Sequence, residues 1–405
     1  MFGRDNYTPN PHSKRQLPRV AELAPLLQFQ KPTFNPVDRR LRKVTDIVEL
    51  RAAARRVAPR AVFDYVDGSA EDEVTLQRLR AEYRAVEFLP RVLRDVSSVD
   101  PSTTLLGAKS ALPFAFAPTG YTRMMHHEGE VAVARAAARL GIPYCLSTVG
   151  TTSPEDLTAA APDALLWFQL YMWKDRAESR RLVERARDAG YTALILTVDT
   201  PVPGNRQRDT RNGLTIPPQL TLSTVANMGT RPSWWINKLT TPTMRFACVP
   251  EAWGNDQADL GDSMFDAGVT FDDIAWLRSF WDGPLVIKGI QTLADATAVV
   301  DLGADGVVLS NHGGRQLDRA QSVLRLLPRV VAECGDRAEI LIDSGILRGA
   351  DILAAVALGA QGVLVGRAYL YGLMAGGERG VLRAGELLAQ EIRTCIALLG
   401  IRSLD

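Results

Sequence analysis

The sequence predicts an α/β fold of the (β/α)8 TIM-barrel type, with an N-terminal helical arm and a long insertion after the fourth strand. Eight short apolar runs recur between residues 114 and 366, and each is followed by a polar or glycine-bearing loop and a helical pattern. The runs are continuously apolar, which is typical of parallel strands that are buried on both faces. Eight such units over roughly 290 residues suit a closed barrel with an insertion. A doubly wound open sheet is the alternative.

The N-terminal part precedes the barrel. Residues 1–45 are rich in Pro, Arg and Lys with little periodicity, so we expect an extended arm that wraps the body or a neighbouring chain, or is partly disordered. Residues 46–405 then form the barrel domain. Its helical pattern begins over 46–56, and Pro59 opens a second helix. The aromatic and acidic stretch 63–73 ends that helix and is either a surface helix end or part of a site.

The strands and helices of the barrel follow in order. The expected strands are 114–117, 144–147, 167–171, 193–199, 285–288, 307–309, 340–343 and 363–366. The expected helices are 128–140, 154–160, 176–189, 271–281, 293–302, 322–333, 350–358 and 378–399.

A long interruption, residues 212–269, separates the fourth and fifth strands. It carries Trp234 and Trp235 and shows few periodic patterns. Loops of such length within compact domains are usually functional, so a lid over the barrel mouth is one interpretation. The Trp pair beside Lys238 also fits contact with a membrane surface, because Trp favours that interface.

Composition limits the class of protein. Hydrophobic residues make up 46% and charged residues 23% of the 405, as in ordinary globular proteins. The formal net charge of +1 argues against nucleic-acid binding, which normally shows a basic surplus. Four scattered cysteines form no CxxC pair and no zinc spacing, so we expect no metal and a reduced, cytoplasmic protein.

Polar residues or glycines stand at the carboxyl end of all eight expected strands, where barrels of this class carry their active sites. They are Thr119 and Gly120, Ser147, Gln169 and Tyr171, Thr197 and Asp199, Lys288, Ser310 and His312, Asp343, and Gly366 and Arg367. His312 follows an apolar run and precedes Gly313 and Gly314. A histidine in this position caps a turn or acts as a base, and the other seven strand ends favour the base.

The rim residues suit proton abstraction from a small carboxylic acid that bears a hydroxyl group. A carboxylate at Asp199 would orient the imidazole of His312 and stabilise its protonated form. Arg206 and Arg315 supply two guanidinium groups, which grip carboxylates bidentately. Tyr65 and Tyr171 could add hydroxyl donors, and Lys288 would stabilise negative charge on a cofactor.

The loops after strands seven and eight predict a phosphate site. Gly345 and Arg348 follow strand seven, and Gly366 and Arg367 follow strand eight, where such barrels commonly bind phosphate. No GxGxxG motif follows a strand, so a Rossmann dinucleotide site is not indicated. Flavin mononucleotide (FMN) would fit, because a redox step needs a cofactor.

The segment 310–318, Ser-Asn-His-Gly-Gly-Arg-Gln-Leu-Asp, resembles the active-site motif of the FMN-dependent L-2-hydroxy acid oxidising enzymes. The family includes glycolate and lactate oxidases, mandelate dehydrogenases and L-lactate dehydrogenases. The likeness extends from about residue 46 to 404 and includes Phe-Asp-Tyr at 63–65, Gln-Leu-Tyr at 169–171 and Thr-Val-Asp-Thr-Pro at 197–201. Segments such as Leu-Met-Ala-Gly-Gly-Glu at 373–378 look most like the bacterial L-lactate dehydrogenases.

The resemblance implies a role for each matching residue. His312 would take the substrate proton with Asp199 paired to it, Arg315 and Arg206 would bind the carboxylate, and Tyr65 and Tyr171 would bind substrate. Lys288 would lie beside the flavin and stabilise its reduced form. The implied flavin contacts are Pro118, Thr119, Gly120, Ser147, Gln169, Thr197, Ser310, Asp343, Gly366 and Arg367.

Three departures from the family pattern matter. Many members have two arginines after the strand-seven glycines, and this chain has Leu347 and Arg348, so one phosphate arginine is missing. Val149 replaces the aromatic residue of glycolate oxidases and leaves room for a larger substrate. Gly120 stands where oxidases typically carry Ala, which favours a dehydrogenase.

The resemblance implies oxidation of an L-2-hydroxy acid, L-lactate to pyruvate above all, with an external quinone or cytochrome as electron acceptor and oxygen as the alternative. The substrate alternatives are L-mandelate or a longer 2-hydroxy acid, and a bulky peptide-derived substrate. A flavin-binding scaffold without turnover is the remaining hypothesis. We also expect a homotetramer or octamer, in the cytoplasm or peripheral at the inner face of the membrane.

Overall fold

Eight parallel strands form a closed barrel in the computed structural model, which describes residues 33–214, 222–250 and 265–404. The strands pair in the order β10-β3-β4-β5-β6-β7-β8-β9. They are β3 (Phe114–Phe116), β4 (Tyr144–Ser147), β5 (Leu166–Leu170), β6 (Ala193–Thr197), β7 (Leu285–Ile290), β8 (Gly306–Leu309), β9 (Glu339–Ile342) and β10 (Gly362–Val365). The predicted (β/α)8 barrel is therefore confirmed, and the open-sheet alternative is excluded.

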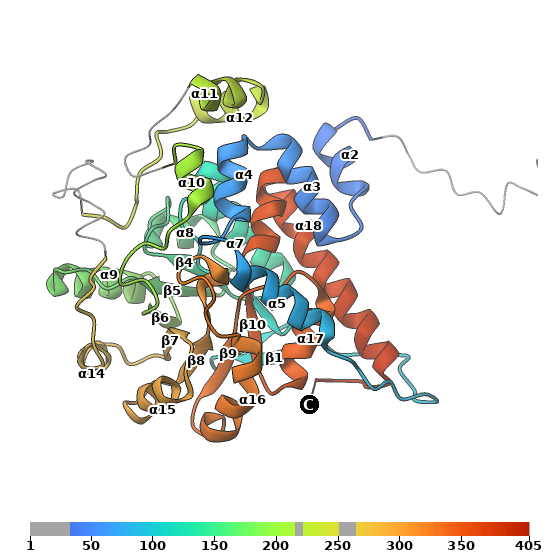
Figure 1. The fold of residues 1–405 in the computed structure, drawn as a ribbon, viewed down its shortest axis with the longest axis vertical. Helices are drawn as coiled ribbons and strands as arrows, with labels where there is room; N and C mark the ends of the chain where they lie inside the picture. The colour runs from blue at the N-terminus through green and yellow to red at the C-terminus, as the bar shows by residue number, and fades with distance from the viewer. Residues whose placement is uncertain (1–32, 215–221, 251–264, 405) are drawn as a thin grey trace, which may run out of the picture.

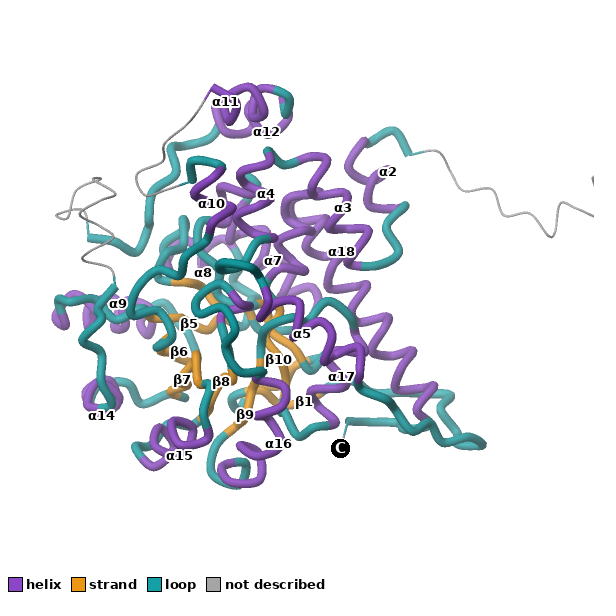
Figure 2. The backbone as a smooth tube through the Cα atoms, viewed as in Figure 1, coloured by secondary structure: helices purple, strands orange, loops and turns teal. Residues whose placement is uncertain are grey.

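Helices surround the strands on the outside (Figure 2). Those that follow or flank the strands are α6 (Thr122–Met125), α7 (Gly129–Leu140), α8 (Pro154–Ala160), α9 (Arg176–Asp188), α14 (Asp272–Arg278), α15 (Leu293–Asp301), α16 (Val323–Cys334), α17 (Gly349–Ala357) and α18 (Arg367–Leu399). The prediction places the last helix at 378–399, but the helical segment begins at Arg367 and breaks at Gly376 and Gly377. The apolar stretch before the break packs as helix because it is buried throughout.

The barrel interior is filled by side chains. Trp167 projects into it, and the small residues Cys145 and Ala193 pair with it on the neighbouring strands and leave the space that its ring occupies. An antiparallel hairpin, β1 (Thr103–Leu105) and β2 (Ala108–Ser110), closes one end, because Leu105 and Leu106 join the same inner cluster. This hairpin has no counterpart in the sequence prediction. With the interior packed, a ligand has room only at the rim of the barrel.

In the described part of the chain, four helices precede the barrel: α2 (Pro36–Arg42), α3 (Ile47–Val57), α4 (Arg60–Asp67) and α5 (Val74–Ala85). Helices α2 and α3 pack along α18 (Figure 1). Composition predicts an extended arm over residues 1–45, but residues 36–42 form a helix, capped by Asn35 and anchored by the buried Leu41. The remainder of that arm, residues 1–32, lies outside the described residues.

The insertion after β6 contains helices in its described part. They are α11 (Leu222–Gly229) and α12 (Pro232–Leu239), which follow α10 (Gln207–Arg211) and lie together beyond α4 and α10 (Figure 1). Trp234 Nε1 donates to the carbonyl of Met124 at 3.0 Å, so α12 is tied to the barrel rim. None of the helices in the described ranges is long and apolar enough to cross a membrane.

All four cysteines are free, and Cys145, Cys248 and Cys334 are buried.

Candidate active site

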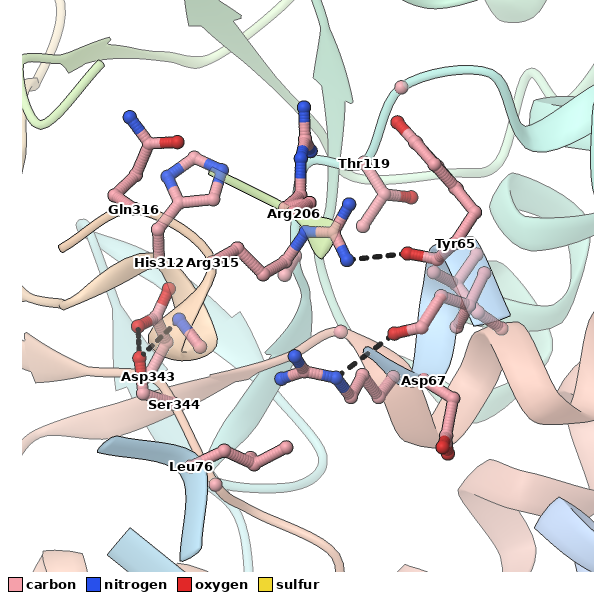
Figure 3. Close-up of a pocket in the computed structure, with 18 of the residues that line it drawn as sticks. Tyr65, Asp67, Leu76, Thr119, Arg206, His312, Arg315, Gln316, Asp343 and Ser344 are labelled. Atoms are coloured by element: carbon pink, nitrogen blue, oxygen red, sulfur yellow. Dashed lines mark hydrogen bonds between the residues drawn. The ribbon is translucent and has the colours of Figure 1, made fainter. Parts of the chain in front are cut away.

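The carboxyl ends of the strands surround a cavity of about 640 Å³. Its lining includes Tyr65, Pro118, Thr119, Gly120, Tyr171, Arg206, Lys288, His312, Arg315, Asp343, Gly345, Gly366 and Arg367. Side chains from α4, the N-cap of α10 and the loop after β8 point into the same space, including Tyr65, Arg206, His312 and Arg315 (Figure 3). Residues that are up to about 300 positions apart in the sequence therefore meet at one end of the barrel, as parallel closure requires.

A strained turn positions His312. Its φ is 56°, in the left-handed region that non-glycine residues seldom adopt, and Gly313 and Gly314 continue at 66° and 75°. Three side chains hold the turn: Ser310 Oγ accepts from His312 N at 3.0 Å, Ser344 Oγ from Gly313 N at 2.9 Å, and Asn311 Oδ1 from Gly314 N at 3.1 Å. The strain is therefore offset locally, and the imidazole is fixed at the cavity.

His312 is paired with Asp199. The two are joined by a hydrogen bond of 3.0 Å between Nδ1 and Oδ1. The Asp199 side chain is only 2% exposed and that of His312 24%, so the imidazole faces the cavity and the carboxylate lies behind it. Burial would raise the pKa of Asp199, but His312 and Lys288 outweigh it and hold this pKa below its ordinary value. With Nδ1 occupied, Nε2 is the nitrogen that faces a substrate.

Two guanidinium groups flank the ring of Tyr65. The Arg315 guanidinium carbon lies 4.9 Å and that of Arg206 5.8 Å from the ring centre. Arg315 donates to the backbone carbonyls of Tyr65 and Gly68 at the end of α4. Burial, with the nearby charge of Arg206, lowers the pKa of Arg315 to about 10, so the group is still protonated at neutral pH. The pair forms a local positive site that suits a carboxylate.

Tyr171 lines the same cavity and is in contact with Phe265, with ring centres 5.1 Å apart. Burial, reinforced by the negative charge of Asp199, raises the pKa of the Tyr171 phenol. Its hydroxyl is therefore protonated and is a hydrogen-bond donor at neutral pH.

Lys288 carries a buried positive charge. Its Nζ donates to Ser310 Oγ and lies 3.0 Å from Asp343 Oδ2. Burial opposes the charge, but the carboxylates of Asp343 and Asp199 outweigh it and raise the pKa of Lys288. The next residue, Gly289, has a φ of 109° at a register shift of β7, where a Cβ would lie 2.7 Å from Asp199 Cβ. This glycine lets Asp199 approach the lysine.

The strand ends fit a flavin. Ser147 pairs with Gln169 across β4 and β5, and Thr197 pairs with Lys288 across β6 and β7. Ser147, Gln169 and Thr197 are buried beside the cavity rather than lining it. Gln169 Nε2 and Thr197 Oγ1 are buried without a hydrogen-bond partner. Such orphaned groups cost stability unless a ligand satisfies them. The flavin ring edge carries alternating carbonyl and N–H groups, so these residues, with Lys288, suit FMN.

The phosphate end of the predicted cofactor site differs from the sequence prediction at Arg348. Its guanidinium is bound by Asp46 at 2.7 Å and Glu391 at 3.0 Å, and the residue does not line the cavity. The carboxylates lie at the start of α3 and on α18, so they draw the side chain to the outside of α17. Arg367 does line the cavity, and its Nε and Nη2 donate to the carbonyls of Val66 and Gly68.

Two aromatic residues of the cavity lining are not named as site residues by the sequence prediction. Phe246 and Phe265 come from the insertion and enclose the cavity, and the ring of Phe246 lies 4.5 Å from that of Tyr121. Val149 packs so closely on Gly120 that a Cβ there would lie 2.3 Å from Val149 Cγ2. No periodicity marks Phe246 or Phe265 because their position depends on contacts with the distant barrel rim.

The aromatic and acidic stretch 63–73 belongs to the wall of this site. Asp67 is buried and accepts hydrogen bonds from Arg51, Arg208 and Tyr371. These contacts tie α4 to α3, α10 and α18. They fix the end of α4, which carries Tyr65 and the carbonyls that hold Arg315 and Arg367.

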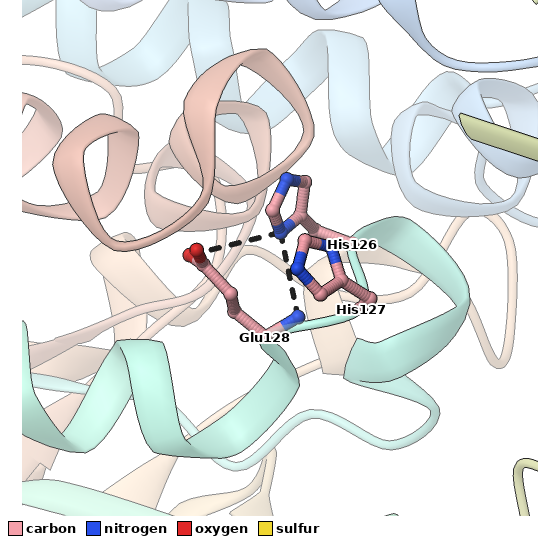
Figure 4. A group of neighbouring side chains, drawn as sticks. All are labelled: His126, His127 and Glu128. Carbon is pink, nitrogen blue, oxygen red and sulfur yellow. Dashed lines mark hydrogen bonds and ion pairs between the residues drawn. The ribbon is translucent and has the colours of Figure 1, made fainter. Parts of the chain in front are cut away.

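A second cluster, His126, His127 and Glu128, lies at the turn between α6 and α7 (Figure 4). Its potential ligand atoms all lie within 4.8 Å of one another. The Glu128 carboxylate, however, accepts from Glu378 N at 2.6 Å, where the missing Cβ of Gly377 leaves space for it. Burial lowers the pKa of His126 to about 4. These contacts join the turn between α6 and α7 to α18.

Comparison with known proteins identifies the family. Residues 54–405 match the family model described as FMN-dependent dehydrogenase. The chain belongs to the FMN-dependent dehydrogenase family. It is an oxidoreductase that acts on 2-hydroxy acids with FMN as cofactor, as the resemblance in the sequence implies.

Individual relatives of this FMN-dependent dehydrogenase support the same family assignment. A Mycobacterium tuberculosis protein provisionally named L-lactate dehydrogenase is 54% identical over 391 residues, 96% of this chain and 94% of that protein. The L-lactate dehydrogenase of Caulobacter vibrioides is 44% identical over 89% of this chain and 95% of its own. Among solved structures, the monotopic membrane protein (S)-mandelate dehydrogenase superimposes with a TM-score of 0.85 at 37% identity, covering 89% of this chain and 97% of that one.

Proposed function

We propose that this dehydrogenase oxidises L-lactate to pyruvate and passes the electrons through FMN to an external quinone or cytochrome. The arrangement of His312 and Asp199 opposite two cavity arginines carries the proposal. If Arg206 and Arg315 hold the substrate carboxylate, C2 of the substrate and its hydroxyl group would lie near Nε2 of His312. The names of the relatives favour lactate among the 2-hydroxy acids.

Each polar residue of the cavity has a separate role in the proposed reaction. Arg206 and Arg315 bind the substrate carboxylate, and the phenols of Tyr65 and Tyr171 donate to its oxygens. His312 accepts a proton from the substrate, and Asp199 stabilises the imidazolium that forms. Bound FMN supplies the oxidant that side chains lack.

Other residues of this chain would hold the cofactor. Gln169, Thr197 and Ser147 would hydrogen-bond to the polar edge of its ring, and Pro118, Thr119 and Gly120 would lie beside the ring. Lys288 would supply a fixed positive charge to it, which would favour its reduced, anionic form. Ser310 and Asp343 hold that lysine. Gly345, Gly366 and Arg367 lie at the end of the cavity that would take the phosphate.

A larger substrate is the second candidate, and a specific observation favours it. Val149 is small, and Phe246, Phe265 and Tyr121 enclose the cavity with aromatic surface. That surface suits an aryl side chain, such as that of L-mandelate, or a bulky peptide-derived group. The structural relative is a mandelate dehydrogenase.

A panel of 2-hydroxy acids tests these assignments. The purified holoenzyme is assayed with L-lactate, L-mandelate and longer L-2-hydroxy acids, each with oxygen, a quinone and cytochrome c as acceptor. We expect the highest kcat/KM with L-lactate and a quinone or cytochrome. A higher kcat/KM with L-mandelate would make L-mandelate the assigned substrate in place of L-lactate. Fastest turnover with oxygen would make oxygen the assigned electron acceptor. No turnover with any acid, with flavin still bound, would support a scaffold without activity.

We further propose that α12 brings the enzyme to a membrane surface, where a quinone is available. Ile236 and Leu239 are 59% and 79% exposed on this helix, next to Trp235. Apolar side chains on a surface helix that also carries Trp favour the interface. Co-sedimentation with liposomes tests this, and the doubly substituted Ile236→Asn, Leu239→Asn protein should stay in solution. Equal binding of both proteins would contradict the proposal.

We also propose a homotetramer or octamer. The loop after α5 carries Leu89, Val92 and Leu93, which are 91%, 81% and 101% exposed. Arg91 N donates to the carbonyl of Leu399 at 3.1 Å, which fixes this loop beside the end of α18. Exposed apolar groups on a fixed loop are typical of an interface. Sedimentation equilibrium should give four or eight chains, and a monomer would contradict this assignment.

A further inference from the structure

The phosphate end of the cofactor site lacks the charge that the family pattern supplies. Leu347 lines the cavity at the position where many members carry an arginine. Arg348 is bound by two carboxylates on the outside of α17. Arg367 remains, and two of its three nitrogens already donate to carbonyls of α4. The single positive charge of Arg367 does not balance a phosphate dianion, and only its third nitrogen is left to donate to one.

Helix α5 presents other cations to the same end of the cavity. Gln77, Arg80 and Arg84 follow one another at spacings of three and four residues, which places them on one face of the helix. All three line the cavity together with Gly345, Ile346 and Leu347. The face therefore lies opposite the loop between β9 and α17.

Close packing holds α5 against that loop. Gly345 has a φ of 82°, and a Cβ on it would lie 3.0 Å from Leu79 Cβ and 3.4 Å from the ring of Tyr83. Arg80 donates to the carbonyl of Gly345 and pairs with Asp351. The Asp351 carboxylate also accepts from the backbone N–H of Leu347 at 2.9 Å. Arg80 therefore stabilises the loop through contacts that occupy its guanidinium group.

Arg84, unlike Arg80, is not held by an ion pair of this kind. In the part of the chain that the structure describes it forms no ion pair, and it lies one turn beyond Arg80 on the same face. We propose that Arg84 supplies the phosphate-binding charge that Leu347 cannot, so that α5 replaces the missing arginine of the loop. This inference rests on FMN being the cofactor, and it assigns to Arg84 a binding role in this chain.

Flavin affinity tests the role without an activity assay. The full-length chain is stripped of flavin and titrated with FMN and with riboflavin, which lacks the phosphate, and bound flavin is followed by its fluorescence. Arg84→Gln should raise the dissociation constant for FMN about tenfold to one hundredfold, the usual effect of losing one hydrogen bond to a charged group. The dissociation constant for riboflavin should not change.

Two further variants complete the experiment. Arg78→Gln is the matched control, since Arg78 lies on the same helix but donates to the carbonyl of Ala320 and does not line the cavity. Leu347→Arg restores the family arginine, so it should tighten FMN binding and recover the loss in the Arg84→Gln background.

The outcomes separate this inference from the function itself. Equal effects of Arg84→Gln and Arg78→Gln on FMN, or an equal loss of FMN and riboflavin, would overturn the role of Arg84 and leave the FMN assignment standing. An unsubstituted chain that binds no FMN would overturn both.

Discussion

Substitution of Asp199 by asparagine removes the charge behind His312 and keeps the shape of the side chain. The Nδ1–Oδ1 distance of 3.0 Å puts the two charge centres about 4 Å apart once His312 is protonated. At an effective dielectric constant of about 20, this separation corresponds to about 4 kcal/mol. Because each 1.4 kcal/mol is about a factor of ten in rate, Asp199→Asn should slow flavin reduction by about a thousandfold.

Rapid mixing under anaerobic conditions measures that rate directly. Reduction of the bound flavin by L-lactate is followed by the loss of its visible absorbance in one turnover. Asp188→Asn is the matched control, because its carboxylate is 70% exposed on α9 and, among the described residues, pairs only with the neighbouring Arg187. A fall of less than about tenfold for Asp199→Asn, with flavin content unchanged, would refute the role given to this pair.

Three further substitutions test other parts of the account. Arg206→Met should raise KM for L-lactate about tenfold to one hundredfold, since a hydrogen bond between charged groups is lost, while Arg211→Met at the other end of α10 should not; equal KM values would contradict this. Gly120→Ala should lower the free energy of unfolding by about 1–3 kcal/mol, because its Cβ meets Val149 at 2.3 Å, and Val149→Ala in the same chain should recover most of the loss. Arg51 and Tyr371 hold the pKa of Asp67 below its ordinary value against the effect of burial, so this carboxylate stabilises the fold above about pH 4 and the stabilisation is lost as the pH falls through the lowered pKa. Asp67→Asn should therefore lower the unfolding free energy in urea by about 1–3 kcal/mol at pH 7 and by less at pH 3, whereas an equal loss at both pH values would contradict the charge argument.

The barrel could be predicted from the sequence because its strands are local, continuous apolar runs. Runs such as 193–197 and 307–309 are buried on both faces, so every residue carries the same signal. The strand ends then share one rim by topology alone. This is why His312, Asp199 and Lys288 could be placed together before any coordinates.

Long-range contacts could not be predicted in the same way. The sequence predicts that Arg348 binds phosphate in the loop after strand seven. In the structure, Asp46 and Glu391, which are far away in the chain, bind its side chain outside the cavity. Helix α2 forms where composition predicts an extended arm, since Leu41 finds a buried position against α18. The cavity positions of Phe246 and Arg84 likewise depend on how the insertion and α5 pack on the barrel.

The central claim is that His312 accepts the substrate proton in an FMN-dependent oxidation of L-lactate. Anaerobic mixing of the holoenzyme with L-lactate, compared with His312→Ala, tests it most directly. The account predicts that the flavin absorbance of the unsubstituted enzyme bleaches, whereas the variant keeps its bound flavin in the oxidised form. A variant that bleaches at the unsubstituted rate, or an unsubstituted enzyme that L-lactate does not reduce, would contradict it.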